Sequence, residues 1–219
     1  MESLKERTRR NLTRVYFLSS SSVDTCYLKQ HRLTRNEIPS DKIQESSLIK
    51  MRIGTIIHAD IQASLGPNVE YEKPLISHKY GVQGRADIVE HNIGDPLIVS
   101  VADIKIIGGY SYKKMFGRDK EIGGIIEKYK KQVAINGVML EEEGYFLDRM
   151  YLIVINRDDA RYREVEVGEK YKDMAITYFM NVINSDENIK PLTENSPMHK
   201  WECNYCEFKT RCLANETSM

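Results

Sequence analysis

The chain has 219 residues, of which 41% are hydrophobic and 29% are charged, a composition typical of a globular protein that builds its own core. Its 32 basic and 32 acidic residues cancel, which excludes a globally basic nucleic-acid-binding protein but leaves local basic patches open. No apolar run approaches the ~20 residues of a membrane span. The stretch MESLKERTRRNLTR lacks the apolar segment of a secretory signal. We therefore expect a protein of the reducing cytoplasm with no membrane partner.

The first third of the chain is predicted to be helical. Four serines at 19–22 indicate a helix start, and this helix should carry Cys26 and end near Arg32. A second, longer helix should open at Pro39 and end before Gly66, because its isoleucines and leucines recur at helical spacing.

The pattern then changes to strands. Residues 69–76, 82–91 and 97–107 read as three strands separated by short turns. The third is rich in isoleucine and valine, as a central strand of a sheet would be. Residues 110–120 follow as a basic loop.

A helix is predicted at 123–143, a buried strand at 149–156, an edge strand at 162–167 and a helix at 169–183. The order predicts an α/β fold with a mixed β-sheet flanked by helices. The chain lacks the glycine-rich phosphate loops of the Walker and Rossmann types. We expect a single domain in three parts: an N-terminal helical part (1–66), an α/β core (67–183) and a cysteine tail (184–219).

The four cysteines suggest a metal site. Cys203, Cys206 and Cys212 form a C-x2-C-x5-C pattern near the end of the chain, and Cys26 lies near its start. The spacing does not suit paired zinc knuckles, whereas three clustered thiolates and one remote thiolate suit a cubane iron–sulfur cluster. Such a cluster would clasp the N-terminal segment to the tail. The alternative is a buried apolar Cys26 and a tail zinc site completed by His199.

Two acidic residues lie within apolar strands. Asp87 and Asp103 should be neighbours across a hairpin, and Lys105 should share the face of Asp103 because side chains alternate along a strand. Two carboxylates at that distance repel, and a divalent cation such as Mg²⁺ or Mn²⁺ relieves the repulsion. Lys105 can then serve a water and a phosphate. The alternative is a structural Asp–Lys pair beside a solvated Asp87.

Two further residues bear on this site. Gly54 and His58 form G-x3-H on the second predicted helix, just upstream of the strands. A lone histidine on an apolar helix is more often structural than a ligand. Gln132 lies on the helix after the Asp-x-Lys strand, where its amide could hold a water or a phosphate.

Taken in order, these motifs form a set: S-x4-C (Ser21 to Cys26), G-x3-H (Gly54 to His58), G-R-A-D (Gly84 to Asp87), D-I-K (Asp103 to Lys105), Gln132, and C-x2-C-x5-C (Cys203 to Cys212). The set resembles the RecB-like branch of the PD-(D/E)xK nucleases in its iron–sulfur form. That branch includes the fourth CRISPR-associated protein family and the AddB nuclease domain. The resemblance covers about residues 19–213. Each motif is weak alone, and their order gives the set its specificity.

The resemblance implies a restriction-endonuclease-like core and a role for each motif. The Mg²⁺ or Mn²⁺ ion would be bound by His58, Asp87, Asp103 and the backbone carbonyl of Ile104. Lys105 would serve the attacking water, and Gln132 would be the glutamine of the helix motif. Cys26, Cys203, Cys206 and Cys212 would hold a structural [4Fe–4S] cluster. Relatives cut DNA, often at single-stranded ends, which makes proteins of CRISPR adaptation or of replication, recombination and repair the expected partners.

Local positive charge suits DNA. Lys113 and Lys114 interleave with aromatic residues in the predicted loop, and Lys131 and Tyr129 lie beside the helix glutamine. Such combinations can hold phosphates and stack bases of a single strand. The alternative is that these residues form solvated faces and core aromatics.

One departure from the family pattern concerns the helix motif. The usual Q-x3-Y has Asn136 at its last position here, and Tyr129, one turn before Gln132, is the available substitute. The leading hypothesis is a metal-dependent DNA exonuclease. The alternatives are a non-catalytic DNA-binding or scaffold subunit with the same fold, and a zinc-containing interaction module with an unrelated sheet.

Overall fold

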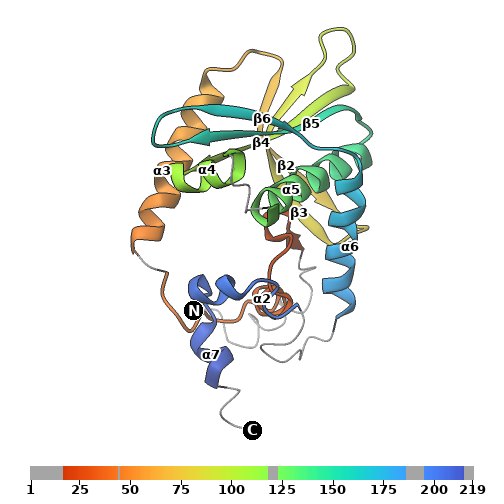
Figure 1. The fold of residues 1–219 in the computed structure, drawn as a ribbon. Coiled ribbons are helices and arrows are strands. Elements are labelled where there is room, and N and C mark those ends of the chain that lie inside the picture. The colour runs from red at the N-terminus through yellow and green to blue at the C-terminus, as the bar shows by residue number, and fades with distance from the viewer. Residues whose placement is uncertain (1–16, 44, 118–122, 186–194, 215–219) are drawn as a thin grey trace, which may run out of the picture.

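The structure is a computed structural model that describes residues 17–43, 45–117, 123–185 and 195–214. Its centre is a six-stranded mixed sheet (Figure 1). The strands are β1 (Leu18–Ser19), β2 (Val69–Ser77), β3 (Val82–His91), β4 (Ile98–Ile107), β5 (Phe146–Asn156) and β6 (Tyr162–Glu166). The order is β1-β3-β4-β5-β6, and β2 pairs with β3. The predicted α/β fold with a mixed sheet flanked by helices is confirmed.

Strand β3 has different neighbours at its two ends. Antiparallel β2 follows it along most of its length, from Val69 opposite Glu90 to Ser77 opposite Val82. Antiparallel β4 pairs with its C-terminal end, from His91 to Ile88. At its N-terminal end the short β1 pairs in parallel, with Leu18 opposite Val82. The segment between these two pairings contains the G-R-A-D motif, and it is here that the candidate site forms.

Within the described ranges, helices surround the sheet: η1 (Ser20–Ser22), α2 (Tyr27–Thr34), α3 (Glu45–Ala63), α4 (Gly109–Phe116), α5 (Gly123–Glu142), α6 (Lys170–Asn184), η2 (Lys200–Tyr205) and α7 (Lys209–Ala214), of which η1 and η2 are 3₁₀ helices. The larger core lies between the sheet and helices α5 and α6, where Ile135, Met139 and Phe179 are fully buried. A smaller core on the opposite face packs Ile61 of α3 against Ile104.

Three sequence predictions about element boundaries need correction. Residues 110–116 belong to helix α4, not to a loop. Gly108 precedes the helix, and the Gly109 amide donates to Asp158 at 2.8 Å. Tyr112 and Met115 then bury one side of it. Residues 118–122 lie outside the described part of the chain.

The two N-terminal helices begin later than predicted. Helix α3 begins at Glu45, not at Pro39, and α2 begins at Tyr27 with Cys26 as the residue before it. The serines at 20–22 form a separate 3₁₀ turn. The first half of α3 exposes several apolar side chains: Leu48, Ile49, Met51 and Ile56. No helix in the described ranges combines the length and the apolar character needed to cross a bilayer.

Candidate functional site

The candidate site begins where β3 and β4 part. Their ladder ends at Ile88 opposite Ala102, and Asp87 is the next residue of β3. The Asp87 carboxylate takes the place of the ladder, because its Oδ2 accepts a hydrogen bond from the Ile104 amide at 2.7 Å. In an extended strand the N–H and C=O of one residue point to the same side. The Ile104 carbonyl is therefore directed toward the same opening as Asp87, as the resemblance requires of a carbonyl ligand.

The G-R-A-D segment needs its glycine for close packing. A Cβ at Gly84 would overlap the Ser20 hydroxyl and come within 2.8 Å of the Asn136 Oδ1. Asn136 is fully buried, and its Nδ2 donates to the Arg85 carbonyl at 3.5 Å. Asn136 thus lies beneath the segment that presents Asp87, and this contact accounts for an amide at the fourth position after Gln132.

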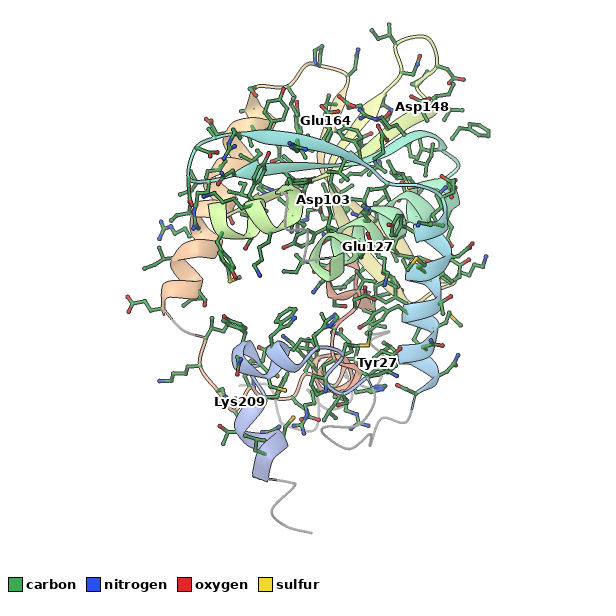
Figure 2. All side chains as sticks on the ribbon, viewed as in Figure 1. Tyr27, Asp103, Glu127, Asp148, Glu164 and Lys209 are labelled. Atoms are coloured by element: carbon green, nitrogen blue, oxygen red, sulfur yellow. The ribbon has the colours of Figure 1, made fainter. Side chains whose placement is uncertain are left out.

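Asp103 is held from two sides. It is only 1% exposed, and it lies within the layer between the sheet and the helices, as Figure 2 shows. Its Oδ1 accepts a hydrogen bond from Gln132 Nε2 on α5 at 2.9 Å. Its Oδ2 lies 2.6 Å from Lys105 Nζ. The shared face of Asp103 and Lys105 is confirmed, and Gln132 contacts the carboxylate directly.

A third carboxylate, Glu72 of β2, joins the site. Ligand atoms of His58, Glu72 and Asp87 all lie within 4.8 Å of one another. The His58 Nδ1 is 3.6 Å from the Asp87 Oδ2. Glu72 has a φ of 50°, a left-handed conformation that a non-glycine residue seldom adopts within a strand. Sequence reasoning misses Glu72, because the alternation of charged and uncharged residues in VEYEK is common to solvated strands.

An open cavity of about 890 Å³ lies beside these side chains, and Ser21, His58, Glu72 and Lys105 are among the residues that line it. Arg85, at its rim, donates to Glu72 Oε2 at 3.1 Å. Gln62 of α3 donates to the Asp87 carbonyl at 2.9 Å. The site is thus reachable from solvent and is braced from α3 and from β2.

Burial and like charge dominate the electrostatics. Burial and, after it, the neighbouring Asp103 carboxylate together raise the pKa of Asp87 to about 7. Burial lowers the pKa of His58, so the neutral imidazole that binds metals is favoured. Burial opposes the charge of Lys105, but the carboxylates of Asp103 and Asp87 outweigh it and raise the Lys105 pKa. Asp87 and Asp103 thus repel each other, and a cation placed between them would relieve that repulsion.

The raised Asp87 pKa predicts an unusual pH dependence of the metal-free protein. An unfolded Asp loses its proton near pH 3.9, whereas folded Asp87 keeps it up to about pH 7. Between these values the folded state binds more protons, so stability should fall as pH rises, by up to about 1.4 kcal/mol per pH unit. His58 acts in the opposite sense below its unfolded pKa.

Urea unfolding with EDTA from pH 4.5 to 7.5 would measure this slope, and the difference between the wild type and Asp87→Asn isolates Asp87 from His58. The wild type should lose more stability than the variant as pH rises. Saturating Mn²⁺ should remove that loss. Parallel curves for the two proteins in EDTA would contradict the electrostatic account.

The residues predicted to contact DNA fall into two groups. Lys113 and Lys114 lie on α4, and the Lys114 Nζ lies 5.4 Å from the centre of the exposed Tyr110 ring. On α5 the Tyr129 ring lies 5.1 Å from Lys105 Nζ, at the candidate site itself. Lys131 is engaged elsewhere, in an ion pair with Asp24 at 2.5 Å, which ties α5 to the N-terminal segment.

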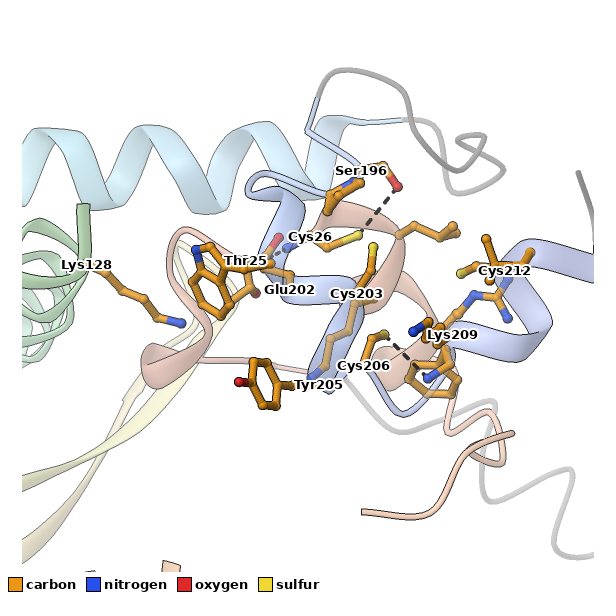
Figure 3. A pocket seen from close by; sticks show the side chains of 17 residues that line it. Thr25, Cys26, Lys128, Ser196, Glu202, Cys203, Tyr205, Cys206, Lys209 and Cys212 are labelled. Carbon is orange, nitrogen blue, oxygen red and sulfur yellow. Dashed lines mark hydrogen bonds between the residues drawn. The ribbon is translucent and has the colours of Figure 1, made fainter. Parts of the chain in front are cut away.

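The four cysteines gather around one cavity of about 230 Å³, which Figure 3 shows from close by. Cys26 comes from the start of α2, and the other three come from η2, α7 and the turn between them. The Cys26 amide donates to Glu202 Oε1 at 3.2 Å, and its sulfur lies 3.5 Å from the Ser196 hydroxyl. The N-terminal segment and the tail therefore meet here, far apart as they are in sequence.

The distances between the cysteine sulfurs and the pKa values of the thiols further characterise this cavity. Among the described residues, His58, Glu72 and Asp87 are the one group of three with ligand atoms within 4.8 Å of one another, so no three cysteine sulfurs are that close. All four are free. Burial raises the pKa of Cys212 to about 11, and it also raises the pKa values of Cys203 and Cys206.

His199 contacts residues of helix η2. It does not line the cysteine cavity. Its ring stacks on Trp201 with centroids 5.8 Å apart, and its side chain caps η2 in a capping box with Glu202. The structure thus offers no His199 ligand to the tail cysteines in the described arrangement.

Comparison with known proteins bears on the fold alone. No protein-family model matches the chain, and no curated protein matches it in sequence. A solved crystal structure, of a protein designated SSO0001, has a TM-score of 0.57 and is 21% identical, covering 96% of this chain and 94% of that one. At that identity the likeness shows a shared fold over nearly the whole chain.

Proposed function

We propose that the protein is a divalent-metal-dependent nuclease that hydrolyses phosphodiester bonds of DNA, acting on single-stranded ends. The observation that carries the proposal is the convergence of Asp87, Asp103 and Lys105 with His58 where β3 and β4 part, beside an open cavity. A half-buried lysine next to two carboxylates and an imidazole supplies the groups that bind a hard cation and a phosphate.

His58, Asp87, Asp103, Glu72 and the Ile104 carbonyl would hold the cation, Mg²⁺ or Mn²⁺. When bound there, the ion would polarise the scissile phosphate and lower the pKa of a water. Glu72 extends the set beyond the family pattern, and it can supply an oxygen on the solvent side of Asp87. Arg85 Nη1 donates to Glu72 Oε2 and holds that carboxylate at the rim of the cavity.

The protein's own groups do the rest. Lys105 presents a positive charge beside Asp103 and can hydrogen-bond the attacking water or a phosphate oxygen. Gln132 fixes the orientation of Asp103 by donating to Oδ1, which leaves Oδ2 for Lys105 and the cation. Gln132 is thus a positioning residue in this proposal and does not itself hold the phosphate.

A single DNA strand can approach along α4, because this helix starts two residues after β4 ends. Lys105 lies two residues before the end of the same strand. Tyr110 is 73% exposed there, and Lys113 and Lys114 follow it. Exposed rings can stack on unpaired bases, and lysines can contact the phosphates between them. A duplex offers no unstacked bases to such a ring, which favours single-stranded ends as the substrate.

For the cysteine cavity we propose a [4Fe–4S] cluster. A single tetrahedral zinc ion with Zn–S bonds of about 2.3 Å would draw its sulfurs to within about 3.8 Å of one another. The wider spacing of the cysteine sulfurs supports a larger group. The cavity is also lined by Lys29, Arg32 and Lys209, whose positive charges suit an anionic cluster.

The test of function is a cleavage assay on end-labelled single-stranded and double-stranded DNA, with Mg²⁺ or Mn²⁺ and with EDTA. We expect metal-dependent loss of the single-stranded label. Asp87→Asn should abolish this cleavage, because the cation would lose the Asp87 carboxylate as a ligand. Arg149→Gln, on the far strand pair β5–β6, is the matched control and should cleave normally. Equal activity of Asp87→Asn and wild type would exclude the proposal.

A further inference from the structure

Arg32 of α2 is a buried cation with one donor left over. Its side chain is 7% exposed. One end of the guanidinium is satisfied, because Nη1 donates to Glu37 Oε2 at 3.2 Å, and the group lies 5.7 Å from the centre of the Phe208 ring. The Nε atom, however, is buried and has no hydrogen-bond partner among the described residues. Buried donors are rarely left unpaired without a reason.

The surroundings of Arg32 indicate where that donor is needed. Arg32 lines the same cavity as Cys26, Cys203, Cys206 and Cys212. Its positive charge acts on Cys212, where it lowers the thiol pKa against the larger effect of burial. The cavity is therefore lined by a group of sulfurs and by a charged side chain whose Nε–H has no hydrogen-bond acceptor among the described residues.

We propose that Arg32 is a positioning residue for the cofactor, and that its Nε–H donates to a sulfur of the cluster or of Cys212 once the cluster is bound. The inference rests on the [4Fe–4S] cluster proposed above. Hydrogen bonds to cluster sulfurs and nearby positive charge both favour the more negative, reduced state. Arg32 thus raises the reduction potential of the cluster and shields its sulfurs.

Two substitutions separate the charge from the hydrogen bond. Arg32→Gln removes the charge, and Arg32→Lys keeps the charge but loses the planar fork with its Nε–H. After anaerobic reconstitution, an EPR-monitored redox titration should place the potential of Arg32→Gln well below that of the wild type, with Arg32→Lys between them. Iron release to a chelator should be several-fold faster in both variants.

Lys29→Gln is the matched control. Lys29 lines the same cavity, but it is more exposed and pairs with Glu207 at 3.5 Å. This variant removes one positive charge without removing the buried donor, so its potential should fall by clearly less than that of Arg32→Gln. A shift as large as that of Arg32→Gln would overturn the hydrogen-bond assignment, as would an Arg32→Lys protein with the wild-type potential and iron-release rate.

Wild-type protein provides a test that needs no variant to fold. With arginine labelled by ¹⁵N at Nε, pulsed EPR of the reduced cluster should show a coupled ¹⁵N nucleus. The absence of that coupling in protein with full iron content would refute the role of Arg32 and leave the cluster itself intact. Wild-type protein that binds no iron after reconstitution would instead remove the cofactor and this inference together.

Discussion

Replacing Lys105 with methionine should lower the cleavage rate at saturating metal by about 10²–10³-fold, the usual effect of removing one well-placed electrostatic group. Methionine keeps the length and apolar stem of lysine, so what is lost is the ammonium 2.6 Å from Asp103 Oδ2. Metal affinity should not fall, because every proposed ligand remains. Single-turnover cleavage and Mn²⁺ titration, measured on the same protein, separate the two effects.

A stability control is needed, because Lys105 is paired with a buried carboxylate and its loss will lower the free energy of unfolding. Lys172→Met supplies it. Lys172 is also mostly buried and pairs with Glu141 and Glu169, both at 2.7 Å, far from the cavity. It should lose stability and keep its cleavage rate. If Lys105→Met cleaved at the rate of Lys172→Met, the Asp-x-Lys motif would be a structural ion pair.

The sequence predicts the parts of this site that depend on local periodicity. Strand alternation places Asp103 and Lys105 on one face, and that placement holds at 2.6 Å. The three strands from 69 to 107 and the long helix with Gln132 are likewise confirmed within a few residues. In each case the decisive signal is an apolar run with a period that only one kind of element can satisfy.

The features that the sequence does not predict are those that depend on strand pairing and on contacts between remote elements. Glu72 joins the site because β2 stays paired with β3 beyond the point where the pairing of β4 with β3 ends. No pattern in VEYEK predicts that geometry. The sequence predicts a loop where helix α4 forms, because the lysines and tyrosines of this segment mask a short amphipathic pattern. Its helical form depends on remote partners, Asp158 at Gly109 and the Arg163 guanidinium 5.2 Å from the Phe116 ring centre.

The candidate metal site and the cysteine cavity are mechanically connected through α5 and the N-terminal segment. Lys131 of α5 pairs with Asp24, two residues before Cys26. The next residue of the same helix, Gln132, holds Asp103, and Lys128, about one turn earlier, lines the cysteine cavity. Loss of the cluster should therefore loosen the segment around Asp24 before it affects the carboxylates, which remain braced by the sheet.

Cys26→Ser should release the cluster and lower the melting temperature by roughly 10–20 °C. Cys26 lies 176 positions from Glu202, which it contacts, so a cluster shared with the tail closes most of the chain into one loop. By the chain-entropy argument for disulfides, a closure of this length contributes about 5 kcal/mol. Each kcal/mol moves the melting temperature of a chain of this size by about 2–4 °C.

The measurements that test Cys26→Ser are iron per chain, absorbance near 400 nm and calorimetric melting. Wild-type protein stripped of iron is the matched control and should melt with Cys26→Ser, while Ser196→Ala, which changes the neighbour of the sulfur but no ligand, should keep its iron. The soluble fraction of Cys26→Ser should retain some cleavage, because its carboxylates are unchanged. Full iron content and normal melting in Cys26→Ser would show that Cys26 is not a ligand of the cluster, whereas wild-type protein that binds zinc and no iron would favour a zinc site.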